Sequence, residues 1–133
     1  MITSLFPQLF DYQFLAPTLL RLTLAAVFIV HGYPKLRDLA GTAGFLGSLG
    51  FRPAKFWAVV LGSTEFFGGI LLAVGLFTQV AAALIAFVML VAIFKVKRAQ
   101  GFVGGYEFEL ALFVIAVSLM LTGPGAYAID LPF

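Results

Sequence analysis

The chain contains no cysteine and only one histidine among its 133 residues. The missing thiols exclude a disulfide, a thiolate metal site and dithiol redox chemistry within this chain. One histidine without cysteine also leaves no usual ligand set for zinc or an iron–sulfur cluster, and it excludes a bis-histidine haem. We therefore expect no metal site and no cofactor held by the chain itself.

Charge is also scarce, because charged residues make up 11% of the chain and hydrophobic residues 62%. Between Lys55 and Lys95 lie 39 residues whose only charge is Glu65. At about 1.5 Å per helical residue, this stretch can cross a hydrocarbon core of about 30 Å twice. Such a stretch cannot form a water-soluble surface, so the sequence predicts an integral membrane protein. Its basic residues flank apolar spans, which predicts contact with the lipid bilayer and excludes a nucleic-acid partner.

The predicted fold class is all-α: a polytopic membrane protein built as a four-helix transmembrane bundle, with residues 1–133 forming a single domain. The expected spans cover residues 16–36, 56–76, 78–94 and 106–121. Gly75 marks a tight turn between the second and third spans, and the Gly-Pro-Gly sequence at 123–125 stops the fourth.

Two segments outside these spans are also apolar. Residues 1–15 contain a helically spaced set interrupted by Pro7, which comprises Ile2, Leu5, Phe6, Leu9 and Phe10. This spacing predicts a short N-terminal segment that lies on the membrane surface. Residues 37–55 are rich in glycine but keep large apolar side chains, so we expect a short re-entrant or interfacial piece there.

The basic residues predict the orientation of the bundle. Four spans place the first and third loops on one side, and seven basic residues lie there: Lys35, Arg37, Arg52, Lys55, Lys95, Lys97 and Arg98. The second loop carries no charge. The positive-inside rule then places both loops in the cytoplasm and both termini outside.

Ionisable side chains inside a span are costly, so each is a functional hypothesis. They are Arg21, His31, Lys35, Glu65, Glu107 and Glu109. On the first helix Arg21, His31 and Lys35 fall, with Phe28, within an arc of about 80°, which should face the bundle interior. Gly62, Gly69 and Ala73 share the face of Glu65, so a neighbouring helix can pack closely there. Glu107 and Glu109 are about 200° apart on a helix, so only one of them can point fully inward.

Two interpretations of these groups remain open. In the first, Glu65 and the carboxylates of the fourth span pair with His31, Lys35 and Arg21 and lock the helices into register. In the second, the same groups form a site that handles protons or binds a ligand, because a carboxylate and a histidine near the membrane midplane can hold and release protons. A paired network can also bind a ligand, so the two are compatible.

The order and spacing of several short motifs resemble the DoxX family of small four-helix bacterial and archaeal membrane proteins. The resemblance covers residues 19–130 and rests on Arg21-Leu22, Phe28, His31-Gly32, Lys35-Leu36, Glu65, Gly68-Gly69, Leu71-Leu72, Gly75-Leu76, Thr78, Gly101-Phe102, Gly104-Gly105, Glu107, Gly123-Pro124-Gly125 and Asp130. It adds Asp130 to the candidate site residues. Many relatives carry serine shortly before that aspartate, where this chain has Ala128.

The resemblance implies a plasma (inner) membrane protein with a redox-linked partner, since the family takes its name from association with a thiosulfate:quinone oxidoreductase. Our first hypothesis is a non-catalytic subunit or anchor of a quinone-linked or sulfur-oxidising complex. The second is a small, oligomeric, proton-coupled transporter that uses Glu65, His31 and Arg21. The third is a membrane protein that binds quinone or lipid, with His31 or Glu65 hydrogen-bonding a quinone carbonyl.

Overall fold

The computed structural model describes residues 5–130, and helices are the only regular secondary structure in that range. The long helices are α1 (Ala16–Arg37), α3 (Ala54–Val74), α4 (Thr78–Ala92) and α5 (Glu107–Thr122). Four stretches are long and apolar enough to cross a membrane, namely Pro7–Arg37, Ala54–Val74, Thr78–Gln100 and Phe102–Thr122. The predicted all-α membrane fold with four spans is therefore confirmed.

The third span is longer than the sequence predicted. After α4 the chain continues through a π-helical turn, η2 (Ile93–Lys97), and a 3-10 turn, η3 (Arg98–Gln100), before an irregular segment, η4 (Phe102–Tyr106), leads into α5. The predicted end of this span was residue 94, directly before Lys95. Long basic side chains at a helix end can instead reach the membrane surface while the backbone stays helical.

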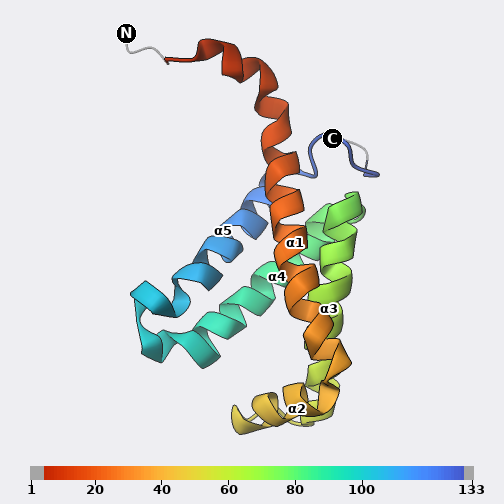
Figure 1. Ribbon diagram of the computed structural model, residues 1–133, viewed down its shortest axis with the longest axis vertical. Coiled ribbons are helices and arrows are strands. Elements are labelled where there is room, and N and C mark those ends of the chain that lie inside the picture. Colours follow the sequence, from red (N-terminus) through yellow and green to blue (C-terminus); the bar gives the residue numbers. More distant parts are fainter. Residues whose placement is uncertain (1–4, 131–133) are drawn as a thin grey trace.

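The two apolar segments outside the spans are also helical. The 3-10 helix η1 (Pro7–Leu15) has no buried residue, and it bends away from the axis of α1 (Figure 1). This geometry suits the expected interfacial segment, although Ile2 lies outside the described residues. Within residues 37–55, α2 (Leu39–Ser48) packs against the start of α3, and Asp38 caps it by accepting a hydrogen bond from the Gly41 amide at 3.0 Å.

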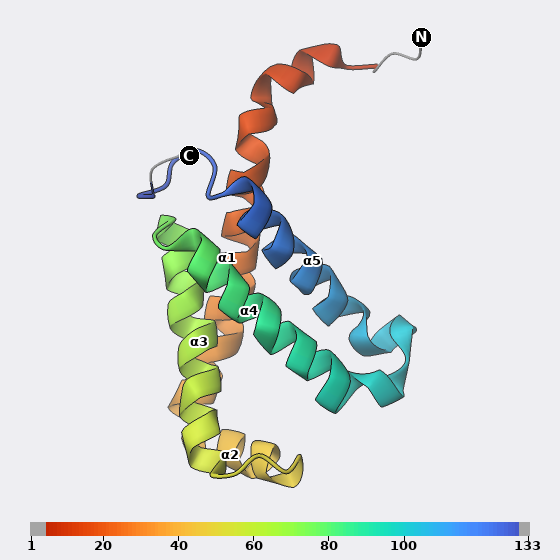
Figure 2. The same ribbon diagram turned by 180° about the vertical axis from the view of Figure 1, so that it is seen from behind.

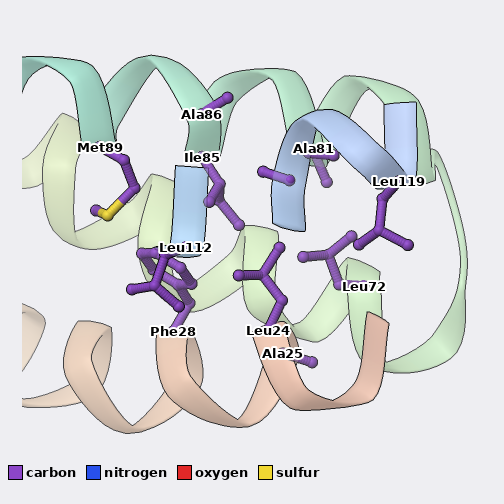
Figure 3. Close-up of a cluster of buried hydrophobic side chains, with 12 residues drawn as sticks. Leu24, Ala25, Phe28, Leu72, Ala81, Ile85, Ala86, Met89, Leu112 and Leu119 are labelled. Atoms are coloured by element: carbon purple, nitrogen blue, oxygen red, sulfur yellow. The ribbon is translucent and has the colours of Figure 1, made fainter. Parts of the chain in front are cut away.

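The helices form two pairs, α1 with α3 and α4 with α5. Both views show α4 and α5 inclined away from the α1–α3 pair toward the loop that joins them (Figures 1 and 2). The shared core therefore lies toward the opposite end of the bundle, where the two pairs meet. Figure 3 shows this core, in which Phe28, Leu72, Ile85 and Leu119 come from the four long helices.

Glycines bring the backbones of α1 and α3 close together. A Cβ atom added at Gly32 would lie 2.5 Å from the backbone nitrogen of Phe66, and one at Gly69 would lie 3.0 Å from that of Ile29. Small residues permit this approach between membrane helices. The predicted close packing on the Glu65 face is thus confirmed at Gly62, which contacts Leu36, and at Gly69.

A tight turn joins α3 to α4, as the sequence predicted. Gly75 ends α3 with a φ of 73°, and Phe77 precedes α4 with a φ of 52°. This turn, the start of η1 and the segment after α5 all lie at the end of the molecule opposite α2 (Figure 1). Four spans thus put both termini on one side and the basic loops on the other.

Candidate functional site

Arg21 is almost completely buried, with 1% of its surface exposed. Its Nε donates to the carbonyl of Pro124 at 2.9 Å, and one terminal nitrogen donates to the carbonyls of Leu72 and Ala73 at 2.7 and 2.8 Å. The other terminal nitrogen donates to Ala126 and Tyr127 at 3.1 and 3.0 Å. A guanidinium has five N–H donors, so these carbonyls use its full capacity.

Most of these carbonyls need a donor because of where they lie, although the Leu72 carbonyl also accepts from the Gly75 amide at 3.2 Å. The last four carbonyls of a helix have no partner within it, and Leu72 and Ala73 belong to the last turn of α3. The other acceptors lie in the irregular segment after α5, where Thr18 also donates to the Ala126 carbonyl at 2.8 Å. Arg21 thus ties α1 to the end of α3 and to the segment 123–130, and it keeps no donor for a ligand.

Asp130 caps α4 from a distance of about fifty residues in sequence. Its two carboxylate oxygens accept hydrogen bonds from the amides of Phe77 and Thr78, both at 2.8 Å. The backbone beside it also pairs with the α3–α4 turn, since the Asp130 amide donates to the Gly75 carbonyl at 2.8 Å. An anionic cap suits a helix N-terminus, so Asp130 fixes this turn. We call Arg21, Thr18, Asp130 and the segment 123–130 the Arg21 network.

The surroundings of Asp130 predict a stability change in acid. Partial burial disfavours its charge, but the amides of Thr78 and Phe77 and the positive charge of Arg21 outweigh burial, so the pKa of Asp130 is lowered. Because the pKa of Asp130 is lower in the folded chain, its ionised carboxylate stabilises the fold at pH values above the unfolded pKa of about 3.9. This stabilisation is lost as the pH falls through the folded pKa. We expect Asp130→Ala to lower the unfolding free energy by about 1–2 kcal/mol at pH 7. The deficit should shrink below about pH 4, as measured by thermal unfolding in detergent across a pH series.

Asp11→Ala is the matched control, because Asp11 is an exposed carboxylate on η1. It should unfold like the parent at every pH of the series. An Asp130→Ala deficit that stays constant through the acid range would contradict the assignment of the ionised carboxylate as the cap.

A separate pair of charges lies near the other end of α1. The Lys35 ammonium is 2.9 Å from a carboxylate oxygen of Glu65, and it also donates to the His31 carbonyl at 3.3 Å. The Glu65 side chain is 4% exposed and that of Lys35 is 31% exposed. Close packing at Gly32 holds the helices near enough for this pair to form. The carboxylate of the ion pair is therefore buried, whereas its ammonium group is partly exposed.

His31 lies next to this pair but faces outward. Its Nδ1 is 2.8 Å from the carbonyl of Val27, which can only accept, so Nδ1 carries the hydrogen. Neutral His31 then presents Nε2 as a hydrogen-bond acceptor. The ring centre lies 6.1 Å from that of Phe108 on α5. The expectation that His31 faces the bundle interior is wrong, because it sits at the edge of the arc and the outward inclination of α5 leaves it exposed.

The carboxylates of α5 do not join this pair. Glu107 is exposed, and Glu109 lies 3.9 Å from Lys97 with a side chain that is 13% exposed. One oxygen of Glu109 is buried without a hydrogen-bond partner among the described residues. Glu109 is thus the carboxylate that points inward, as the helical angle allowed for one of the two, but its partner Lys97 lies at the end of η2.

The seven predicted site residues consequently divide into separate groups. Arg21 and Lys35 are fourteen residues apart on one helix, which separates them by about 21 Å along its axis. Arg21 and Asp130 stabilise one end of the bundle, Lys35, Glu65 and His31 form a site in the other half, and Glu109 pairs with Lys97. A single network that neutralises Arg21 with Glu65 is excluded. We call His31, Lys35, Glu65 and Phe108 the Lys35–Glu65 site.

Sequence reasoning missed the carbonyl ligands of Arg21. A helix end at Val74 and a Gly-Pro-Gly segment both leave carbonyls without partners. These two features could have indicated that a buried donor is needed there. Within residues 5–130 no group of three or more histidine or acidic side chains could hold a metal ion.

The sequence profile of the DoxX family matches residues 16–98. The chain belongs to the DoxX family. The matched range contains both Arg21 and the ion pair of Lys35 with Glu65.

Curated relatives support the same assignment. The chain is 37% identical over 115 residues to a Bacillus subtilis (strain 168) protein named "Putative oxidoreductase CatD", covering 86% of this chain and 84% of that protein. It is 33% identical to the inner membrane protein YqjF of Escherichia coli (strain K12), covering 83% and 85% respectively. Similarity to YphA, another inner membrane protein of that organism, is 32% and covers 59% and 58%. No solved structure matches the chain. This DoxX protein is thus a multi-pass protein of the inner membrane.

Proposed function

We propose that the chain is a non-catalytic membrane subunit that anchors and supports a redox enzyme. The main support for this proposal is that the chain contains no cysteine and a single histidine. A relative at 37% identity bears the name of an oxidoreductase. If this chain has a related role, the electron-carrying group belongs to a partner, because this chain has no usual ligands for a metal redox centre.

The partner should bind on the side that carries the basic loops. We infer from the positive-inside rule that these loops are cytoplasmic and that both termini lie outside. On that side α2 exposes Phe45, with 52% of its surface accessible, between Arg37 and Arg52 in sequence. An exposed apolar side chain with nearby basic residues suits an acidic, amphipathic partner surface.

The Lys35–Glu65 site supports a link to the quinone pool. Its fit to a quinone head group rests on His31, whose Nε2 is an outward-facing acceptor beside the ring of Phe108. Such an acceptor suits the hydroxyl of a quinol, and Phe108 suits its flat ring. A bound quinone would supply two-electron redox chemistry. His31 would accept a hydrogen bond from the hydroxyl of the reduced form, the quinol, and Lys35 with Glu65 would provide charge next to that hydrogen bond.

One purification tests both parts of this proposal. We expect the tagged chain, taken from native membranes in mild detergent, to carry a flavin-, haem- or iron–sulfur-containing subunit in stoichiometric amount by mass spectrometry. Organic extracts of the same preparation should contain quinone. His31→Ala should lose most of that quinone but keep the partner, because the two binding surfaces lie on different parts of the chain.

Tyr33→Phe provides the matched control, since Tyr33 is an exposed aromatic residue on the same helix. It should keep both the partner and the quinone. A homo-oligomer without any cofactor-bearing subunit would contradict the anchoring role. Equal quinone content in the His31→Ala and parent preparations would reject the site but leave the anchoring role standing.

A further inference from the structure

A crevice lies between the end of the third span and the start of the fourth. It has a volume of about 360 Å³ and is lined by Leu90, Ile93, Phe94, Arg98, Tyr106, Leu110 and Phe113. This volume falls within the range of about 300–1,000 Å³ that is usual for ligand sites. Five of its seven lining residues are apolar, so its walls suit a hydrocarbon chain.

The local fold makes this crevice. The π-helical turn η2 widens the end of the third span, and η4 returns the chain to α5 with non-helical backbone at Val103, Gly104 and Gly105. The α4–α5 pair is also inclined away from α1 and α3 here (Figure 2), so no helix of the other pair covers the outer side of this loop. π-Helical turns in membrane and soluble helices often mark functional positions.

Arg98 places positive charge at the mouth of the crevice. Its guanidinium carbon lies 6.0 Å from the centre of the Phe94 ring, which holds the side chain over the apolar wall. Arg98 is exposed, and it forms no ion pair within residues 5–130. A second crevice of about 370 Å³, lined by Phe94, Lys95, Val96, Arg98 and Ala99, meets the first at Phe94 and Arg98. Lys97 is partly neutralised by Glu109, so Lys95 and Arg98 supply the net charge.

The depth of the site matches the membrane surface. The uncharged run of the third span ends at Phe94, and the helix continues through Lys95 to Gln100, so Lys95 and Arg98 lie directly beyond the apolar segment. Leu90 and Phe113, in contrast, lie one to two turns deeper. The crevice is therefore apolar where acyl chains lie and basic where phosphate groups lie.

We propose that this crevice is a binding site for an anionic phospholipid, with an acyl chain between α4 and α5 and the phosphate at Arg98 and Lys95. The charge complementarity at Arg98 favours an acidic head group over a zwitterionic one. Tyr106 adds a hydroxyl donor to the lining. This site is independent of the redox role and of the Lys35–Glu65 site, since it shares no residue with either.

Native mass spectrometry of the purified full chain tests the site by measuring lipid affinity. The probes are phosphatidylglycerol and phosphatidylcholine with identical acyl chains, and glycerol phosphate as a free head group. We expect the chain to bind phosphatidylglycerol more tightly than phosphatidylcholine. Arg98→Gln should weaken phosphatidylglycerol binding roughly fivefold, as expected for the loss of one basic side chain at an anionic membrane surface. Arg98→Lys should keep most of the affinity, and an excess of glycerol phosphate should not displace the lipid.

Arg37→Gln is the matched control, because Arg37 is also an exposed basic residue at the end of a span but does not line either crevice. It should change the affinity less than twofold. Equal effects of Arg37→Gln and Arg98→Gln would overturn the proposal in favour of general surface charge. Equal affinity for the two lipids, or displacement by glycerol phosphate, would overturn it as well. The Arg98→Gln chain should fold normally, since the Arg98 side chain donates no hydrogen bond within residues 5–130.

Discussion

Replacement of Arg21 by alanine should be strongly destabilising. The substitution leaves the carbonyls of Leu72, Ala73, Pro124, Ala126 and Tyr127 without their shared donor. Hydrogen bonds to a charged group contribute about 1.5–3 kcal/mol each, and some of these carbonyls can turn to water at the membrane surface. A loss of about 5 kcal/mol or more is therefore expected, against a total stability of about 5–15 kcal/mol for a typical domain.

The measurement is thermal unfolding of purified variants in one detergent, followed by circular dichroism. Arg21→Lys should fall between the parent and Arg21→Ala, because an ammonium has three donors in a different geometry and cannot serve five carbonyls. Arg37→Ala is the control, as Arg37 lies exposed on the same helix. Arg21→Ala with the same unfolding temperature as Arg37→Ala would contradict the structural role of Arg21.

The two partners of the Lys35–Glu65 ion pair should differ in how much their loss destabilises the chain. Lys35→Met leaves a carboxyl group that is 4% exposed, whereas Glu65→Leu leaves an ammonium that is 31% exposed and can extend toward the membrane surface. Breaking a buried pair on one side costs about 3–5 kcal/mol. We expect Lys35→Met to approach that loss and Glu65→Leu to fall clearly below it.

The double variant Lys35→Met with Glu65→Leu should recover most of the stability. Apolar replacement of both partners of a buried ion pair is often neutral or stabilising. Unfolding measurements on the parent, both single variants and the double variant form a double-mutant cycle that isolates the pair. Glu107→Gln, at an exposed carboxylate, is the control. If the double variant is as unstable as Lys35→Met, the two side chains do not act as a pair.

The double variant also separates structure from function. A folded chain without the ion pair that no longer supports quinone-linked electron transfer would assign the pair to function. Full support of that transfer would assign it to helix packing alone. The sequence alone left both roles, helix packing and function, open.

Membrane spans and helix contacts were predictable from the sequence because the bilayer limits the choices. Long apolar segments must be helical in lipid, and Gly62 and Gly69 marked the face on which α1 packs. The pairing of Lys35 with Glu65 was also within reach, since both are charged residues on predicted inward faces. The turn at Gly75 and Phe77 was also predictable, because the apolar stretch between Lys55 and Lys95 is long enough to cross the bilayer twice.

The roles of Arg21, Asp130 and His31 could not be predicted, for different physical reasons. Arg21 binds main-chain carbonyls. The helix end at Val74 and the Gly-Pro-Gly segment indicate carbonyls that need donors, but they do not indicate which side chain supplies them. Asp130 caps a helix that begins fifty-two residues earlier, which requires the fold of the segment after α5. His31 lies at the edge of a helical arc, so its exposure depends on the inclination of α5 and not on its own periodicity.

We propose that this DoxX protein supports a redox enzyme without carrying an electron itself. The most direct test is the quinone-reduction rate of the copurifying enzyme in membranes from a strain that lacks this chain. We expect a large loss of that rate and its recovery when the chain is restored. An unchanged rate in the membranes of the deletion strain would exclude a supporting role for this chain in that enzyme.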